Sequence, residues 1–596
     1  ERETYRGQLA YRLDLRQEKS LLRWLGMQQL LGYGEFKENR SRTTIWRDML
    51  VSPHAWNPTR TGTSSNYAPL NTAFTYYRYY VGDNQGFNAD QGPRDFTPGI
   101  YPYRWGGWTN PGAANATPNF VTEQAKLAPD FWFDSTSTWD KAILRTGGVV
   151  LQSHLLSDRI VSTFGFRQDA RDQRQRGTPL FRALPDNTVV LDYDSTFNLN
   201  PADWVHAEGK TKTAGVVVKP LRWLNLHYNQ SDSFQPQGYA VGLYLGPLPD
   251  PTGHGNDYGF SLNLFGGKLV LRANKYETTQ INSRNGSARI IAQRVRNLDF
   301  DSPNGNQFFN LATRAASWVT NAAALQGRTL TSDQINQEVA RVTKLDVSFF
   351  TRPEARDVQN ELVAETQDVT AKGVEVEVHW NPTAFWTTKF NVTKQESIDS
   401  KLAPAVSQWI NERLPIWQSI IDPEINRPWW TERYNGTNSP SQFFASSVKT
   451  PYDVAVANQG KSRPQIRKYR VNLSTSYRLA GLGLEREWIK RFTLGGALRW
   501  EDKAAIGYYG VEQFPAVITT LDPNRPIYDQ QRLYLDAFAS YRLKLTKKIN
   551  TSLQLNVRNL QENGRLQPIS AFPDGTPNAY RIVDPRQFIL SATFDL

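Results

Sequence analysis

Residues 533–545 read LYLDAFASYRLKL, and an apolar side chain stands at every second position from Leu533 to Leu545. Most of the positions between them are polar or charged. Because successive side chains of a β-strand point to opposite faces, this segment predicts a strand with one apolar and one polar face. The same alternation returns at 5–15, 469–479 and 492–500. Period-two patterning therefore runs from the first residues of the chain almost to the last.

Two classes of protein show such alternation, and the sequence favours one of them. A soluble antiparallel sheet buries one face and is the commoner source of the pattern. The strands predicted here, however, run about 10–14 residues, whereas soluble strands have about 5–6. Tyr and Trp often stand at their ends, as at the interfaces of a membrane barrel. We therefore predict strands that cross a membrane, where a closed barrel satisfies every backbone N–H and C=O group.

The composition of the 596 residues excludes other classes. No apolar run approaches the roughly 18 residues of a transmembrane helix. A disordered chain would not carry 18 Trp, 26 Tyr and 29 Phe. The absence of cysteine excludes thiolate zinc sites, disulfide scaffolds and thiol chemistry. The chain opens Glu1-Arg2-Glu3 rather than with methionine, which suggests an N-terminus that has been cut or left out.

About 15 strands are predicted, joined alternately by short turns and long stretches. Two of the long stretches contain predicted helices, at 335–343 and 406–420. This arrangement is typical of an outer-membrane barrel with periplasmic turns and extracellular loops. Because single-chain bacterial barrels have an even number of strands, we expect at least one strand before Glu1. The predicted strands are 3–15, 23–37, 143–155, 159–169, 211–219, 223–233, 257–265, 268–279, 372–380, 386–395, 467–479, 490–502, 532–545, 551–560 and 585–596.

The final segments resemble those of TonB-dependent outer-membrane receptors. The closing strand RQFILSATFDL (586–596) alternates and carries an aromatic residue close to the terminus, and LQLNVRNL (553–560) is similar to the family's penultimate strand. VKPLRWL (218–224) and GVEVEV (373–378), the latter followed by NPT (381–383), look like its periplasmic hairpins. Each motif is weak alone. Their order and their spacing to the C-terminus make the set fairly specific, and it covers most of the chain.

The resemblance implies an all-β fold, a transmembrane antiparallel β-barrel of the 22-stranded type with long extracellular loops that carry short helices. Residues 1–596 would be the C-terminal part of that barrel, holding about its last 15 strands. In the family an N-terminal plug fills the barrel and carries a box gripped by an inner-membrane energy-coupling protein. Neither can be matched here, so we expect the plug and the first strands to be missing from this chain. The unmatched plug and box affect what this chain alone implies about energy coupling; they do not affect the predicted barrel fold.

Motifs of covalent or phosphate chemistry are not found. The sequences GKT (209–211) and GKS (460–462) end like phosphate loops, but Trp204 and Ala455 replace the upstream loop glycine. The six histidines show no i, i+4 pairing that would favour a metal site. Glu375 and Glu377 share the polar face of one strand, so we interpret them as lumen lining rather than an acid–base pair. We expect no enzyme activity, no metal and no cofactor.

The formal net charge of +12 is spread along polar strand faces rather than gathered in one block. For that reason we expect no nucleic-acid partner. The lumen would be lined by cations that contact either a plug with acidic residues, which we favour, or an anionic solute. These cations are Arg470, Arg478, Arg499, Arg542 and Arg558.

Two aromatic clusters in the long stretches are the candidate substrate-binding residues. Aromatic faces stack on sugar rings and flat organic ligands, and guanidinium groups pair with carboxylates or phosphates. Loop packing or interfacial anchoring is the alternative role, and we weight it above ligand contact. The candidates are Tyr101, Tyr103, Arg104, Trp105, Trp108, Arg427, Trp429 and Trp430.

We therefore expect a receptor in the cell outer membrane of a Gram-negative-type bacterium. It would bind a large, scarce solute of the siderophore, cobalamin or oligosaccharide class in its extracellular loops and import it through a plug-gated barrel. The resemblance implies outer-membrane lipid and a TonB-type complex as partners, and it leaves room for a surface lipoprotein or envelope partner. The alternatives are a passive porin, a surface-active barrel enzyme and a structural barrel of an envelope complex.

Overall fold

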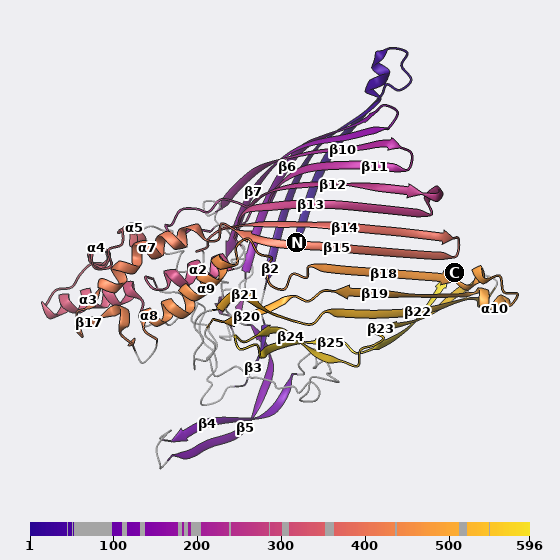
Figure 1. Ribbon diagram of the computed structural model, residues 1–596. Coiled ribbons are helices and arrows are strands. Elements are labelled where there is room, and N and C mark those ends of the chain that lie inside the picture. The colour runs from indigo at the N-terminus through magenta and orange to yellow at the C-terminus, as the bar shows by residue number, and fades with distance from the viewer. Residues whose placement is uncertain are drawn as a thin grey trace.

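The computed structural model describes residues 1–43, 46–50, 52, 98–109, 116–131, 138–176, 181–183, 189–191, 204–237, 240–284, 287–300, 309–351, 363–434, 438–511, 521–546 and 549–595. Its main element is one antiparallel sheet of 15 strands, which Figure 1 shows as a curved wall. In sheet order, which is also chain order, the strands are β1 (Arg2–Asp14), β2 (Met27–Thr43), β6 (Thr138–Leu155), β7 (Ile160–Arg176), β10 (Val205–Leu221), β11 (Leu224–Phe234), β12 (Thr252–Leu264), β13 (Leu269–Ser283), β14 (Gln367–Thr383), β15 (Trp386–Ser400), β18 (Tyr469–Arg478), β19 (Phe492–Glu501), β22 (Arg532–Lys544), β23 (Asn550–Arg558) and β26 (Gln587–Asp595).

The register of the sheet gathers the alternating apolar positions on one face. Leu498 of β19 pairs with Leu473 of β18 and with Leu535 of β22, and the same phase continues through all 15 strands. This face carries many exposed apolar side chains, far more than a water-facing surface tolerates. We call it the outward face and the opposite, polar face the inward face. Its exposed members include Tyr5, Leu9, Tyr11, Leu30, Phe36, Val149, Leu151, Phe164, Phe166, Leu226, Tyr228, Tyr258, Phe260, Val374, Leu494, Leu533, Leu553, Leu555, Phe588 and Leu590.

The short turns lie together at one end of the sheet and the long loops at the other (Figure 1). Arg16, which follows β1, forms an ion pair of 3.7 Å with Asp158 in the β6–β7 turn, so these two turns are neighbours. Aromatic pairs stand on the outward face at the turn end. The rings of Trp380 and Trp386 are 5.3 Å apart, and those of Phe492 and Tyr541 are 4.6 Å apart. Such a girdle is expected where strands pass through a membrane interface.

The predicted antiparallel sheet is confirmed, and each of the 15 predicted strands overlaps one strand of the structure. The predicted start of the second strand at residue 23 is wrong, because a 3-10 helix, η1 (Leu21–Leu25), precedes β2. Ser20 caps that helix and Gly26 ends it with a φ of 62°, which a strand does not allow. No helix in the described part of the chain is long and apolar enough to cross a membrane.

Three loops at one end of the sheet fold together into what we call the helical cap. They are the described parts of the β11–β12, β13–β14 and β15–β18 connections, and Figure 1 shows their helices grouped at the loop end. The predicted helices at 335–343 and 406–420 are confirmed with shifted bounds as α4 and α7. The cap contains α2 (Ser287–Arg296), α3 (Leu311–Leu325), α4 (Ser332–Thr343), α5 (Ser348–Thr351), α7 (Pro404–Ser419), η5 (Trp429–Thr431), α8 (Pro440–Phe443), the π-helix η7 (Phe444–Lys449) and α9 (Thr450–Ala457).

The helical cap has its own apolar core. Leu243 of the first loop, Phe309 of the second and Trp409 of the third are all fully buried in one cluster. A buried ion pair crosses this core, since Arg413 Nη2 lies 2.5 Å from Asp299 Oδ1 and the Trp417 indole N–H donates to the same oxygen at 2.9 Å. Burying three loops against one another in this way fixes the outer end of the sheet.

Smaller hairpins lie in other connections and were not predicted from the sequence. The predicted loop 40–140 contains a three-stranded sheet of β3 (Trp46–Leu50), β4 (Gly99–Thr109) and β5 (Thr117–Phe131). The remaining pairs are β8 (Phe181–Ala183) with β9 (Val189–Leu191), β16 (Ile421–Asp422) with β17 (Arg427–Pro428), β20 (Ala505–Gly510) with β21 (Leu521–Tyr528), and β24 (Arg565–Ala571) with β25 (Pro577–Val583).

Candidate functional site

The inward face of the last six strands forms a hollow of about 570 Å³. Its inward-facing charges are Lys389, Asp536 and Arg558, set among Ser, Thr and Asn side chains. Phe538 is the aromatic residue of the hollow, and it lies directly across the sheet from Gly495. A Cβ atom at Gly495 would overlap the Phe538 ring, so the glycine lets the ring lie flat along the wall. The hollow therefore has a mixed lining, in which Phe538 and Ile589 are the large inward-facing apolar side chains.

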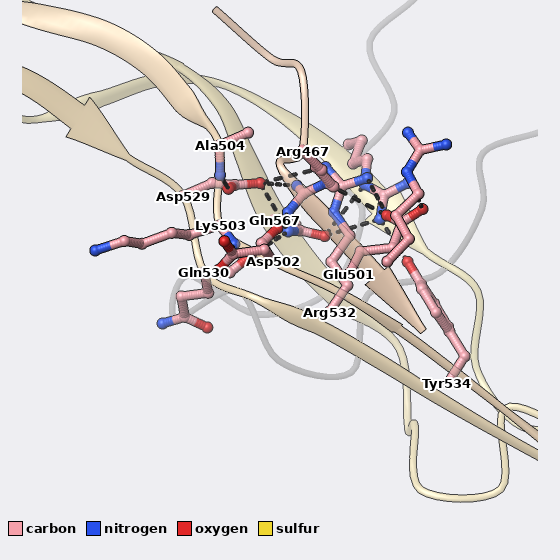
Figure 2. Close-up of polar contacts among 12 residues, drawn as sticks. Arg467, Glu501, Asp502, Lys503, Ala504, Asp529, Gln530, Arg532, Tyr534 and Gln567 are labelled. Carbon is pink, nitrogen blue, oxygen red and sulfur yellow. Dashed lines mark hydrogen bonds and ion pairs between the residues drawn. The ribbon is translucent and has the colours of Figure 1, made fainter. Parts of the chain in front are cut away.

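Toward the loop end of the same strands, a buried cluster of charges surrounds Asp529. Figure 2 shows Arg467, Arg532 and Gln567 directed toward this carboxylate. Arg467 binds Asp529 through Nη2 and places Nε 3.3 Å from Glu501, while Arg532 Nη2 lies 3.3 Å from Asp529. The backbone N–H of Ala504 donates to the other Asp529 oxygen at 2.7 Å. The Asp529 carboxylate is thus held by groups from three separate segments.

Gln567 extends the cluster to the β24–β25 hairpin. Its side chain is fully buried and donates to Asp529 Oδ2 at 3.2 Å. Its own oxygen accepts from Arg581 Nη2 at 2.9 Å, and Arg581 in turn donates to the Tyr534 hydroxyl at 2.6 Å. Because every link is a hydrogen bond or an ion pair, the loop hairpin is fixed to the rim of the sheet. We call this arrangement, together with Arg470, Arg499 and Asp536, the rim cluster.

The rim cluster carries an excess of positive charge. It contains five guanidinium groups and three carboxylates, which leaves a formal charge of +2. Arg470 and Arg499 are its accessible cations, with 43% and 57% of their side chains exposed. Their ion pairs are long, at 3.8 Å to Glu501 and 4.0 Å to Asp536. An anion approaching the inward face from the loop end would therefore meet two cations that are only weakly held. The members are Arg467, Arg470, Arg499, Arg532, Arg581, Glu501, Asp529 and Asp536.

A second hollow of about 610 Å³ adjoins the rim cluster. It is lined by Asp502, Asp529 and Glu562 together with Lys503 and Arg565, so it has both signs of charge. In the part of the chain that the structure describes, no three carboxylate or imidazole side chains gather as metal ligands would.

The predicted cluster at 427–430 lies in the helical cap. Trp429 is fully buried, and its indole N–H donates to the Phe309 carbonyl at 2.7 Å. Trp430 is half-buried and stacks on Trp417 with a ring separation of 5.9 Å. Arg427 is exposed and lies 3.6 Å from a Glu432 oxygen. Trp429 therefore packs the cap core, while Arg427 and part of Trp430 stay accessible.

The predicted cluster at 101–108 lies on β4, in the hairpin with β5 that Figure 1 shows projecting from the loop end. Strand alternation places Tyr101, Tyr103 and Trp105 on one side of this hairpin. Arg104 is exposed on the other side, where its guanidinium lies 4.5 Å from the centre of the Phe120 ring. Trp108 pairs with Pro118 in the backbone register. The two predicted clusters thus lie on different structural units.

The residues interpreted as lumen lining fall on the inward face. His379 Nε2 lies 2.5 Å from Glu377, and His227 Nε2 lies 3.1 Å from the Asn274 side-chain oxygen. The predicted cations Arg470, Arg478, Arg499, Arg542 and Arg558 share the phase of these residues. Sequence reasoning missed Arg467, Asp529, Gln567 and Arg581 of the rim cluster. Arg467 and Asp529 stand next to strand ends, and Gln567 and Arg581 lie on the short β24–β25 hairpin of one connection, so the alternation of the long strands gives no signal for them.

Comparisons with known proteins give structural matches only. No protein-family model and no curated protein sequence matches the chain. Among solved structures, the ferric preacinetobactin receptor BauA from Acinetobacter baumannii aligns with 100% of this chain at 11% identity and a TM-score of 0.48. The siderophore receptor PiuA from the same organism aligns with 100% at 14% identity and 0.44, and the ferric-catecholate import receptor Fiu from Escherichia coli K12 with 99% at 11% and 0.42.

The chain spans about half the length of these structures, covering 54% of BauA, 56% of PiuA and 54% of Fiu. These solved structures are TonB-dependent siderophore receptors, the family that the closing strands of this chain resemble.

Proposed function

We propose that this chain forms the membrane wall and outer loops of an outer-membrane receptor that captures a large anionic solute of the siderophore class for import. The observation that carries the proposal is the sheet itself, whose continuous apolar outward face lies opposite an inward face with a guanidinium-rich rim at the loop end. Lipid can satisfy the outward face, since exposed apolar surface of this extent is unstable in water. Backbone groups inside the sheet are already paired, as a lipid environment requires.

The helical cap favours a receptor over a passive porin. Three loops form one shared core at the loop end. A simple pore does not need long connections that fold together in this way. An anionic ligand would first meet the accessible cations Arg470 and Arg499 of the rim cluster. We propose that the two aromatic clusters are outer contacts that stack on the ligand. They are the 427–430 cluster and the β4 residues Tyr101, Tyr103, Arg104, Trp105 and Trp108.

Import itself requires partners beyond these residues. The resemblance to the family implies a plug that closes the lumen and a TonB-type complex that moves it, and both belong to this proposal. The hollow with Lys389, Asp536 and Arg558 is the surface that we propose for contact with such a plug. The charged and hydroxyl groups of this hollow suit a partner that must move, because a hydrogen bond to the partner can be exchanged for one to water at little net cost in free energy.

The proposal is tested by ligand binding to the purified full-length protein. Ferric siderophores, cobalamin and neutral oligosaccharides are titrated, with tryptophan fluorescence as the readout. We expect an anionic ferric complex to bind, and Arg470→Gln/Arg499→Gln to weaken it at least about tenfold, since a charge-assisted hydrogen bond contributes about 1.5–3 kcal/mol. The matched control is Arg542→Gln, an inward-facing cation at the turn end. Binding of the neutral solutes alone, or equal loss in the control, would refute the assignment to an anionic solute.

The porin alternative is tested separately in planar bilayers. A passive pore gives a large and constant conductance without any ligand or energy source. We expect no such conductance from the full-length receptor. A steady open-pore current would favour the porin instead.

A further inference from the structure

A repeated order of side chains appears on the outward face of three strands, read from the turn end toward the loop end. On β10 the order is Ala214, Lys212, Lys210, Glu208. On β13 it is Ala273, Lys275, Glu277, and on β15 it is Val392, Lys394, Glu396. In each strand a lysine is thus the first charged residue beyond the apolar part of the outward face. β14 follows with Val374 and then Lys372.

The sheet register shows that these lysines border the apolar surface directly. Lys212 pairs with Phe166, which is exposed on the outward face. Lys275 and Lys394 both pair with Val374, one from each side, and Lys394 also pairs with Tyr469. The Lys275 ammonium lies 5.6 Å from the centre of the Tyr258 ring. We call Lys210, Lys212, Lys275, Lys372 and Lys394 the lysine belt.

The lysine belt lacks the ion pairs that neutralise several of the charges around it. All five lysines are exposed, and in the described part of the chain none has a carboxylate within 4.0 Å. Several of the charges nearer the loop end are in ion pairs. Arg145 lies 2.5 Å and His206 2.8 Å from Asp172, and Lys468 lies 3.3 Å from Glu396. A row of ammonium groups without carboxylate partners therefore runs along the border of the apolar surface.

We propose that the lysine belt binds the phosphate groups of outer-leaflet lipids. The inference rests on the membrane placement in the proposed function, but not on the imported solute. The phosphates of lipid headgroups lie at the border of the hydrocarbon layer, and the lysine ammonium binds phosphate as a compact point charge. Lys275 and Lys394 stand two strand spacings apart, about 10 Å, so both side chains can reach one phosphate lying over Val374.

Binding of lipid phosphate can be distinguished from snorkelling, in which a lysine side chain only extends its charged end into water. A lysine that only keeps its ammonium group in water should show no preference among neighbouring lipid headgroups. Cations near an anionic membrane surface instead each strengthen lipid association about fivefold. The difference therefore appears as a preference for a phosphate-bearing lipid over the same lipid without phosphate.

The test uses the full-length protein in phosphatidylcholine nanodiscs that contain a minor fraction of phosphatidic acid. After extraction in mild detergent, lipids retained on the protein are measured by mass spectrometry. We expect phosphatidic acid to be enriched, and Lys212→Gln/Lys275→Gln/Lys394→Gln to lose at least about tenfold of that enrichment. The matched control, Arg6→Gln/Arg272→Gln/Arg542→Gln, removes three inward-facing charges and should keep it. Replacing the three lysines by arginine should restore most of it.

Two further measurements show whether the bound phosphate belongs to a lipid, and the possible negative results distinguish failure of the lysine belt from failure of the membrane placement. Diacylglycerol, which lacks the phosphate, should show no enrichment, and inorganic phosphate should not displace the bound lipid. Equal retention of both lipids, or equal loss in the inward-facing control, would overturn the lysine belt while leaving ligand binding by the receptor intact. Failure of the wild-type protein to enter nanodiscs would refute the membrane placement, and with it both proposals.

Discussion

Replacing Asp299 by asparagine should unfold the helical cap under conditions where the sheet stays folded. The Asp299 side chain is fully buried and accepts three hydrogen bonds, from Arg413 Nε at 3.1 Å, Arg413 Nη2 at 2.5 Å and the Trp417 indole at 2.9 Å. The neutral amide that Asp299→Asn introduces would leave the buried Arg413 without a counter-charge. Removing one partner of a buried ion pair costs about 3–5 kcal/mol, which we take as the expected loss of cap stability.

The assay is urea unfolding followed by tryptophan fluorescence. Trp409, Trp417 and Trp429 are the fully buried tryptophans of the cap core, so loss of the blue-shifted part of the emission reports the cap. The remaining tryptophans contribute a background that the β-sheet signal in circular dichroism identifies, because that signal follows the sheet. Arg341→Gln is the surface control, because its partner Glu338 is exposed and such pairs contribute little. A loss below about 1 kcal/mol in Asp299→Asn would refute the reasoning, since it would mean that water reaches the pair.

The double variant separates ion-pair strength from burial. Asp299→Leu/Arg413→Met removes both charges together and should be far more stable than Asp299→Asn. Buried ion pairs replaced by apolar residues of similar volume are often neutral or stabilising. An equally unstable double variant would show that apolar packing cannot replace these bonds.

Three further changes are expected to have measurable effects. Gly495→Val should clash with the Phe538 ring and lower sheet stability by about 1–3 kcal/mol, seen as a lower temperature for loss of the folded band on a gel, whereas Gly34→Val, with open space around it, should not. Burial raises the pKa of Glu365, outweighing hydrogen bonds from the Ala405 and Thr366 backbone. The folded cap therefore holds the proton more tightly than the unfolded chain, so cap stability falls as the pH rises above the ordinary glutamate pKa of 4.5. Glu365→Gln should remove this fall in urea titrations at several pH values, and an unchanged pH profile would contradict it. Trp430→Ala should weaken ligand binding without unfolding the sheet, which binding and circular dichroism together would check.

The sheet could be predicted from the sequence because its signal is local and repeated. A strand between lipid and a polar interior must alternate, so segments such as 469–479 identify themselves without knowledge of their neighbours. The cap helices α2 and α3 were missed because they pack against other loops through contacts across more than a hundred residues, such as Arg294 of α2 with Ser447 and Arg314 of α3 with Glu424. The start of α4 was placed three residues late because Thr331 and Gln334 cap it through their side chains.

The rim cluster could not be predicted from the sequence for a related reason. Asp529 and Arg467 follow no period, and they meet Gln567 only when the β24–β25 hairpin folds back over the strand ends. The aromatic cluster at 427–430 was visible as composition, but sequence could not separate Trp429, which is fully buried, from the accessible Arg427. Whether the accessible members contact a ligand stays a prediction.

The shared core of the helical cap has a mechanical consequence. Leu243, Phe309 and Trp409 come from connections between different pairs of strands, so displacing one connection drags the other two. We therefore expect these connections to move together rather than as three independent loops. If the proposed solute binds to one of them, the expected consequence is a coupled displacement at the loop ends of β11, β12, β13, β14, β15 and β18 rather than a change confined to one loop.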